Sequence, residues 1–512
     1  MCVGLFLYHT VPQIMKIQIR KDRETMKQRT ISLALAALLL GAAMISCSDA
    51  AEQTQQQTNA PQSEAVVTEA PSIYDNLPKE DFGGYEFRVL NNTSNFAYTN
   101  FGLDGQTGEA LDDVIFERNA KVEEALNIKL TITDMGWEDN QKAINTTVPA
   151  GEDAYDIYFN ELHFVLGQAL NGYLMDYAEI DTFNFDNVWW NKAAIESASI
   201  GNSIYAAFGD LHLMYYECFF PIVFNKQILN NLDLDDPYQL VNDGKWTLDV
   251  MMSMMMAAKQ DVDGDGKWTV ADQYPIGVWE HNVNGLLVSA EADVLTKNAD
   301  NIPVWVGLDE HFLNVYNKLV ASAFAEKTNN VANASGFKSE NGSEVLHVMM
   351  QEGKVLFYIE PLGSVKKMRD VDYEIGVVPM PKYDEAQEDY RSYIYHGAGS
   401  MGIPKTNSDT ARTGIICEYL SAYSHETVKE TYFNETLDFK YIQDEEGQKM
   451  LDIIFSNGTV DLTAVYGWAN VQGTIRSQLF NGKADVVSRV EKLAAKIESG
   501  IADTIEALAN NG

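Results

Sequence analysis

Residues 109–134 read EALDDVIFERNAKVEEALNIKLTITD, and this stretch sets the pattern for the globular part of the chain. Leu111, Ile115, Val122 and Leu126 recur near one helical face, so the first part predicts an amphipathic helix. The ending LTITD alternates apolar and polar residues and predicts a strand. A helix that leads directly into a strand is typical of an α/β protein.

The same alternation continues on both sides of this stretch. YEFRVLN at residues 85–91 and YDIYFNEL at residues 155–162 have the character of strands, and residues 164–180 (FVLGQALNGYLMDYAEI) have that of a helix. There is no internal repeat. We therefore expect an α/β architecture with mostly parallel sheets.

Composition limits the class of protein and its partners. The chain has 512 residues, of which 46% are hydrophobic and 11% aromatic, so it can form two or three domains with substantial cores. Its formal net charge is −37. Such an acidic surface repels nucleic acid and anionic lipid headgroups, so neither is expected as a partner.

The segment 26–47, MKQRTISLALAALLLGAAMISC, has the layout of a targeting signal. Lys27 and Arg29 precede an apolar run that is too short to favour a membrane-spanning helix, and Ser46 is a small residue just before Cys47. The ending resembles the lipobox of bacterial lipoproteins, which implies cleavage before Cys47, lipidation of its thiol and tethering outside the cytoplasmic membrane. The alternative is an ordinary secretory signal with an incidental cysteine. We assign residues 1–47 to the signal peptide, with Met26 as an alternative start.

Residues 48–72 are rich in Gln, Thr, Ala, Ser and Pro and contain no aromatic residue. This composition predicts a disordered tether, because the segment cannot bury enough surface to offset its ordering entropy. Of the remaining cysteines, Cys218 and Cys417 are far apart in the sequence. They fit either a disulfide or two buried free thiols.

Residues 261–272, DVDGDGKWTVAD, have the ligand spacing of a calcium loop, with Gly266 at the sharp turn. A helix at residues 246–259 precedes the loop, but QYPIGVWEH follows it and predicts a turn into a short strand. Because no second helix or second loop completes a sensor, we expect a structural calcium site. The alternative is an acidic turn whose side chains cap backbone amides. The candidate ligands are Asp261, Asp263, Asp265, Lys267 through its backbone carbonyl, and Asp272, which is shorter than the usual Glu.

Three longer stretches carry a family resemblance: residues 200–232, 351–385 and 396–423. They contain the phrases IYAAFGD…IVFNKQIL, GKVLFYIEPLG…YEIGVVPMP and HGAGSMGIPK. In this order they resemble the extracellular solute-binding proteins of family 1, the receptors of ATP-driven (ABC) importers for sugars and related solutes. Further matches are VWWNKAAIESASIGNSIY (188–205), DPYQLVNDGKWTLDVM (236–251) and DEEGQKMLDIIF (444–455). The family often has a proline soon after the first tyrosine of its crossing phrase, and YAAFGD lacks it.

The resemblance implies a two-lobed periplasmic-binding-protein-like fold with a hinge of crossing strands and a solute held between the lobes. We expect residues 82–212 and 358–395 in the first lobe. The second lobe would hold residues 213–357 and 396–512, including the calcium loop.

A sugar ligand needs aromatic faces for its C–H groups and carboxylates or amides for its hydroxyls. Residues of these types lie near the expected crossings and strand ends, and Glu161 and Glu360 directly follow strand-like runs. Each aromatic residue has ordinary packing as its alternative. The candidate ligand-binding residues are Asn160, Glu161, Trp189, Trp190, Asp210, Tyr216, Trp279, Glu360 and Trp468.

We therefore expect a non-enzymatic receptor that captures a carbohydrate and delivers it to ABC permease subunits, anchored by lipid on the outer face of the cytoplasmic membrane. No serine elbow, Walker loop or HExxH zinc motif is present in the sequence. Two alternatives stay open. One is a surface-anchored glycoside hydrolase, which needs two suitably placed carboxylates; the other is a sensory glycan-binding lipoprotein.

Overall fold

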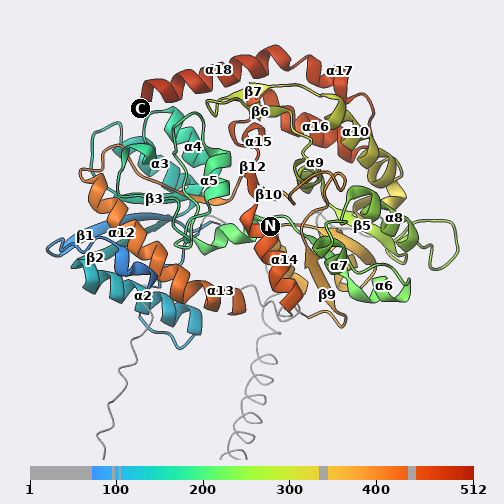
Figure 1. Ribbon diagram of the computed structural model, residues 1–512, viewed down its shortest axis with the longest axis horizontal. Coiled ribbons are helices and arrows are strands. Elements are labelled where there is room, and N and C mark those ends of the chain that lie inside the picture. Colours follow the sequence, from blue (N-terminus) through green and yellow to red (C-terminus); the bar gives the residue numbers. More distant parts are fainter. Residues whose placement is uncertain are drawn as a thin grey trace, which may run out of the picture. The chain divides into compact units, whose positions relative to one another are not determined.

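The computed structural model describes residues 72–94, 98–102, 105–333, 344–368, 370–435 and 445–511. The signal peptide, Cys47 and nearly all of the expected tether lie outside the described residues. Element labels follow Figure 1.

A four-stranded sheet, which we call the first sheet, has the strand order β11-β3-β1-β2. Its strands β1, β2 and β3 are at the left of Figure 1. β1 pairs in parallel with β2 and β3, whereas β11 pairs antiparallel with β3. The pairing of β1 with β2 runs from Tyr85↔Ile128 to Asn92↔Met135. The strands are β1 (Tyr85–Asn92), β2 (Ile128–Met135), β3 (Ile157–Glu161) and β11 (Gly399–Gly402).

Helices α2 (Ala110–Leu126), α3 (Trp137–Thr147), α4 (Leu162–Leu170) and α12 (Thr410–Tyr423) pack against this sheet or against each other. α2 ends at Asn127, whose left-handed φ of 49° turns the chain into β2. The helix expected at 164–180 is shorter, because the chain turns at Gly172 (φ +72°).

The second sheet has the order β5-β8-β4-β9. β5 and β8 are parallel, and β4 is antiparallel to both β8 and β9. Every residue of these strands is buried, as is typical of strands covered on both faces. The strands are β4 (Ile222–Asn225), β5 (Tyr274–Val278), β8 (Val355–Ile359) and β9 (Ile375–Val378).

The helices in contact with the second sheet include α8 (Leu248–Ala258), which was expected at 246–259 and begins after an N-cap at Thr247. Its buried methionines face β5 and β8. The other helices of this layer are α6 (Lys226–Asn231), α7 (Pro237–Asn242), α11 (Glu344–Gln351) and α14 (Glu445–Ser456).

Two short ribbons and the C-terminal helices complete the fold. β10 (Ser392–Ile394) pairs in parallel with β12 (Gly458–Val460), and β6 (Leu295–Lys297) forms a hairpin with β7 (Pro303–Trp305). The ribbon of β10 and β12 contacts α5 (Lys192–Ala198) and α9 (Asn284–Ser289). The remaining helices are α10 (Glu310–Leu319), α13 (Lys429–Glu435), α15 (Leu462–Tyr466), α16 (Val471–Phe480), α17 (Val486–Glu491) and α18 (Ala494–Asn511).

The strands do not follow the expected lobe boundaries. The segment 358–395 was expected in the first lobe, but its strand β9 pairs with β4 in the second sheet. The segment 396–512 was expected in the second lobe, but β11 completes the first sheet. Both strands are only four residues long and carry no pattern that selects a sheet, so the sequence alone does not assign them.

Candidate functional site

Side chains that can hydrogen-bond or stack with a ligand lie at the ends of strands in both sheets. Glu161 is the last residue of β3, Trp279 follows β5, and Glu360 follows β8. In open α/β sheets, ligands bind outside the carboxyl ends of the strands. These strand ends are therefore the candidate site.

Around Glu161 lie three side chains that we call, together with it, the histidine cluster: His163, Tyr395 and His396. His163 Nδ1 lies 3.6 Å from Glu161 Oε2. The ring centroids of His163 and His396 are 5.7 Å apart, and those of Tyr395 and His396 are 4.4 Å apart. The cluster joins the end of β3 to the turn between β10 and β11.

Residues of α16 and of the segment after β5 approach the same cluster. Arg476 on α16 has its Nε 3.8 Å from Glu280 Oε1, and both Arg476 and His281 act electrostatically on His396. The buried atoms Arg476 Nε and His396 Nδ1 have no hydrogen-bond partner among the described residues. Unpaired polar atoms of this kind are available to a bound molecule.

Burial lowers the pKa of three histidines at the site, namely His163 and His396 of the cluster and the neighbouring His281. It lowers the pKa of His163 and His281, and it lowers the pKa of His396 to about 4. The positive charge of Arg476 lowers the pKa of His281 and His396 further. At neutral pH each imidazole is therefore uncharged and offers one donor and one acceptor, which suits hydroxyl groups.

Trp137 supplies an aromatic face beside the cluster. It directly follows Gly136 at the end of β2 and is 41% exposed. Its ring stacks on Phe164 with a centroid distance of 5.5 Å and an interplanar angle of 10°, and Phe164 in turn lies 4.0 Å from His163. An exposed, fixed indole can pack against the C–H face of a sugar ring.

Glu360 and Trp279 stand at the end of the second sheet. Glu360 is only 8% exposed, and burial raises its pKa to about 7. Ser364 Oγ donates to Glu360 Oε2 over 3.5 Å. Trp279 is half-buried and meets Phe480 of α16 edge to face at 6.0 Å.

Asn160 lies behind the cluster and makes internal hydrogen bonds. Its Oδ1 accepts from Asn92 Nδ2 over 2.8 Å, and its Nδ2 donates to Asn140 Oδ1 over 2.9 Å. It also accepts from the backbone N–H of Glu161. Asn160 therefore fixes the end of β3 from within.

Three other candidates are also engaged inside the protein. Asp210 accepts from Tyr216 Oη over 2.8 Å and pairs with His425 and Lys429. The indole N–H of Trp468 donates to Thr504 Oγ1 over 3.0 Å, which attaches it to α18.

Trp189 and Trp190 are both buried and share one carboxylate. Their indole N–H groups donate to Glu418 Oε2 and Oε1 over 2.7 and 2.9 Å. Asn184 and Asn187 donate to the same carboxylate. The indole N–H groups of both residues are therefore used inside the fold. This agrees with ordinary packing, the alternative given for the aromatic candidates.

The candidates predicted from the sequence did not include Trp137, His163, His396 or Arg476. Trp137 follows a strand that the sequence predicted, so the strand-end rule that indicated Glu161 also applied to it. His396 opens the HGAGS phrase. Arg476 carries no local signal, because its helix is brought to the cluster only by the tertiary fold.

The loop 261–272 brings three carboxylates together. Ligand atoms of Asp261, Asp263 and Asp265 lie within 4.8 Å of one another, so this triad is suited to a metal ion. All three of these carboxylates also accept backbone N–H groups within the loop, as the acidic-turn alternative predicts. Asp272 differs in being fully buried; its two oxygens accept the backbone N–H groups of Val262 and Thr269. The triad is therefore compatible with a cation and with a capped acidic turn, whereas Asp272 is used inside the fold.

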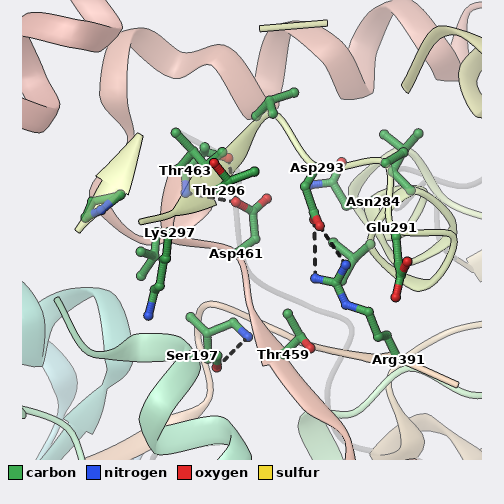
Figure 2. A pocket seen from close by; sticks show the side chains of 18 of the residues that line it. Ser197, Asn284, Glu291, Asp293, Thr296, Lys297, Arg391, Thr459, Asp461 and Thr463 are labelled. Atoms are coloured by element: carbon green, nitrogen blue, oxygen red, sulfur yellow. Dashed lines mark hydrogen bonds and ion pairs between the residues drawn. The ribbon is translucent and has the colours of Figure 1, made fainter. Parts of the chain in front are cut away.

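A hollow with a different lining is shown in Figure 2; it adjoins the candidate site through Gln472, which accepts from Arg476 Nη1 over 3.5 Å. It has a volume of about 680 Å³ and is lined by α5, the end of α9, the β6–β7 hairpin, β12 and α16. None of its lining residues belongs to the histidine cluster.

Cys218 and Cys417 are both free and buried, which decides against the disulfide alternative. Among the residues that the structure describes, no helix combines the length and apolar character needed to cross a bilayer.

Neither a protein-family model nor a curated protein matches this sequence. Solved structures do match it. A family 1 extracellular solute-binding protein from Bifidobacterium longum subsp. infantis has a TM-score of 0.53 at 12% identity, covering 81% of this chain and 100% of that one. An extracellular solute-binding protein from Staphylococcus aureus, in complex with maltose, has a TM-score of 0.51 at 12% identity, covering 83% and 97%.

A cyclo/maltodextrin-binding protein in complex with maltotetraose gives a TM-score of 0.52 at 12% identity, covering 83% of this chain and 96% of that one. These neighbours are solute-binding proteins. The expected α/β, two-lobed periplasmic-binding-protein-like fold is thereby confirmed over most of the chain.

Proposed function

We propose that the protein is an extracellular receptor that captures a carbohydrate between its two lobes and delivers it to an ABC importer without changing it. One observation carries this proposal. His396 of the histidine cluster is influenced electrostatically by Arg476 on α16 and by His281, which follows β5 of the second sheet, and Arg476 pairs with the neighbouring Glu280. A molecule held there touches both halves of a fold whose neighbours are solute-binding proteins.

The chemistry of the cluster favours a polyhydroxylated solute. Neutral imidazoles can donate to and accept from hydroxyls. Arg476 Nε, which has no hydrogen-bond partner among the described residues, can donate to them, and Trp137 offers a stacking face. Of the residues expected from the sequence, we propose Glu161, Glu360 and Trp279 as ligand contacts. To them we add Trp137, His163, His396 and Arg476.

The test is a thermal-shift screen of the purified chain against mono- and oligosaccharides, amino acids and peptides, followed by calorimetry of each positive. We expect a carbohydrate to raise the melting temperature. Trp137→Ala and Glu161→Gln should each weaken its affinity at least tenfold, whereas Trp268→Ala, within the loop 261–272, should not. Products of sugar cleavage in the same mixtures would favour the hydrolase alternative instead.

We further propose that the Asp261–Asp263–Asp265 triad binds a structural calcium ion. Carboxylate oxygens are the ligands that calcium prefers, and Gly264 and Gly266 adopt the positive φ values of 70° and 75° that let the loop curl around an ion. Lys267 would contribute its backbone carbonyl. In this proposal calcium fastens the end of α8 to β5.

Cleavage before Cys47 and lipidation of its thiol also belong to the proposal, supported by the lipobox-like sequence alone. Mass spectrometry of the membrane fraction tests it. A diacylglyceryl modification on Cys47 is expected, and recovery of an unmodified chain in the medium would contradict it.

A further inference from the structure

The hollow of Figure 2 is built from elements that are distant in the sequence. α5 forms one wall, the loop after α9 and the β6–β7 hairpin form another, and residues 457–463 run between them. At about 680 Å³, its volume lies within the usual range of small-molecule sites.

The cationic groups of this pocket are already engaged by the protein. Lys297 Nζ donates to the backbone carbonyl oxygens of Glu196 and Ser199, each over 2.7 Å. The guanidinium of Arg391 makes two contacts with the carboxylate of Asp293, of 2.6 and 3.3 Å. A ligand that needs cationic donors would have to break these contacts.

The pocket lining also has hydrogen-bond acceptors, and these remain available to a ligand. Asn284 is 3% exposed, lines the pocket, and its Oδ1 has no hydrogen-bond partner among the described residues. A buried acceptor without a partner destabilises the fold unless a bound donor satisfies it. The carboxylates of Glu291 and Asp389 are exposed at the rim, and that of Asp461, which accepts from Thr463, lies deeper.

The lining therefore carries more negative than positive charge. The lining has two cationic side chains, Lys297 and Arg391, and five carboxylates, those of Glu196, Glu291, Asp293, Asp389 and Asp461. Apolar side chains fill the spaces between them, including Leu287, Val288, Leu462 and Ile475. The complementary molecule has several N–H donors and positive charges separated by methylene groups.

We propose that this pocket is a second binding site, distinct from the histidine cluster, and that it takes an aliphatic polyamine. Its ammonium groups donate to Asn284 Oδ1, Asp461 and Glu291, and its methylenes pack on the apolar lining. A sugar fits less well, because its hydroxyls also need donors and those of Lys297 and Arg391 are engaged. The carboxylates of the pocket do not converge as metal ligands; among the described residues only the 261–265 triad does.

The experiment titrates spermidine into the full chain by calorimetry at fixed ionic strength, with magnesium chloride as the probe for diffuse counter-ion binding. We expect saturable binding of one spermidine. Asn284→Leu and Asp461→Asn should each weaken it at least tenfold. Asp300→Asn removes an exposed carboxylate of the connection between β6 and β7 that does not line the pocket, so it should leave the affinity unchanged.

Melting curves of the variants show which of them are folded. If Asn284→Leu or Asp461→Asn does not fold, Glu291→Gln replaces it, because Glu291 is exposed and its substitution should not disturb the fold. Glu291→Gln should weaken spermidine binding at least threefold. Equal affinity in all variants, or competition by magnesium at equal ionic strength, would reduce the effect to attraction by the acidic surface and overturn the proposal. Maltose binding that the same variants weaken would overturn the assignment to an amine.

Discussion

The buried carboxyl group of Glu360, which directly follows β8, makes the stability of the fold depend on pH. Its pKa is raised from 4.5 to about 7, chiefly by burial, so the folded protein holds an extra proton between these values. The free energy of unfolding therefore falls as the pH rises through this window. The free energy of unfolding of Glu360→Gln, measured relative to that of the wild type, should therefore rise by on the order of 3 kcal/mol between pH 5 and pH 8.

Urea unfolding of both proteins at the two pH values measures this difference. Comparing wild type with variant cancels the contributions of the other titrating groups. A difference that does not change with pH would show that Glu360 ionises in the folded protein as it does in the unfolded chain.

Glu418 is expected to be a stability residue without a role in solute binding. Its carboxylate accepts from Trp189 and Trp190, and removing it leaves two buried indole donors unpaired. We expect Glu418→Leu to lower the free energy of unfolding by about 3 kcal/mol or more, while solute affinity is retained. Urea unfolding and calorimetry check the two parts. Glu498→Leu, an exposed change on α18, is the matched control and should cost less than about 1 kcal/mol.

At the residue scale, the sequence predicted those candidates whose position follows from local structure. Glu161 and Glu360 end or follow strands, and the structure places them there. Trp189 and Trp190 carry the same residue type as a stacking platform, but their partner Glu418 lies more than 220 positions away. No local pattern distinguishes a tryptophan that a distant carboxylate holds in the core from one left exposed, as Trp137 is.

At the scale of elements, the 261–272 loop supports a prediction about calcium. Because the ion would bind only the folded loop, it should raise the melting temperature by mass action. Asp261→Ala with Asp265→Ala should abolish the increase and leave solute affinity nearly unchanged. Differential scanning fluorimetry with calcium or chelator, followed by calorimetry with the solute, measures both effects.

Asp235→Ala, an exposed acidic residue outside the loop, is the control and should keep the calcium response. Loss of solute affinity in the double variant, to the same extent as the loss of the calcium response, would place the ion at the solute site.

Helices and strands with a clear period were predictable, and their assignment to a sheet was not. α2, α8 and β2 lie within a few residues of their expected bounds. β9 (IGVV) and β11 (GSMG) are short, buried strands, and each is compatible with either sheet until its partners are known. Sheet membership depends on pairing with β4 and β3, which long stretches of sequence separate from them.

For the whole molecule, the proposed function predicts a change of shape. If the solute bridges the ends of both sheets, binding should favour the closed arrangement of the lobes. Small-angle scattering should show a smaller radius of gyration with saturating carbohydrate, and Trp137→Ala should need more carbohydrate for the same change. An unchanged radius at saturation would mean that the solute binds without lobe closure.

The position of β11 has a consequence for how the chain acquires its structure during synthesis. The first sheet receives β1, β2 and β3 from residues 85–161, but its last strand comes from residues 399–402. A chain that emerges from its N-terminus onward must therefore keep one edge of β3 unpaired until more than 200 further residues have appeared. Contacts of such long sequence separation fold slowly, and an open strand edge invites pairing with other chains. Expression yield should accordingly depend on chaperones that shield this edge while the polypeptide is incomplete.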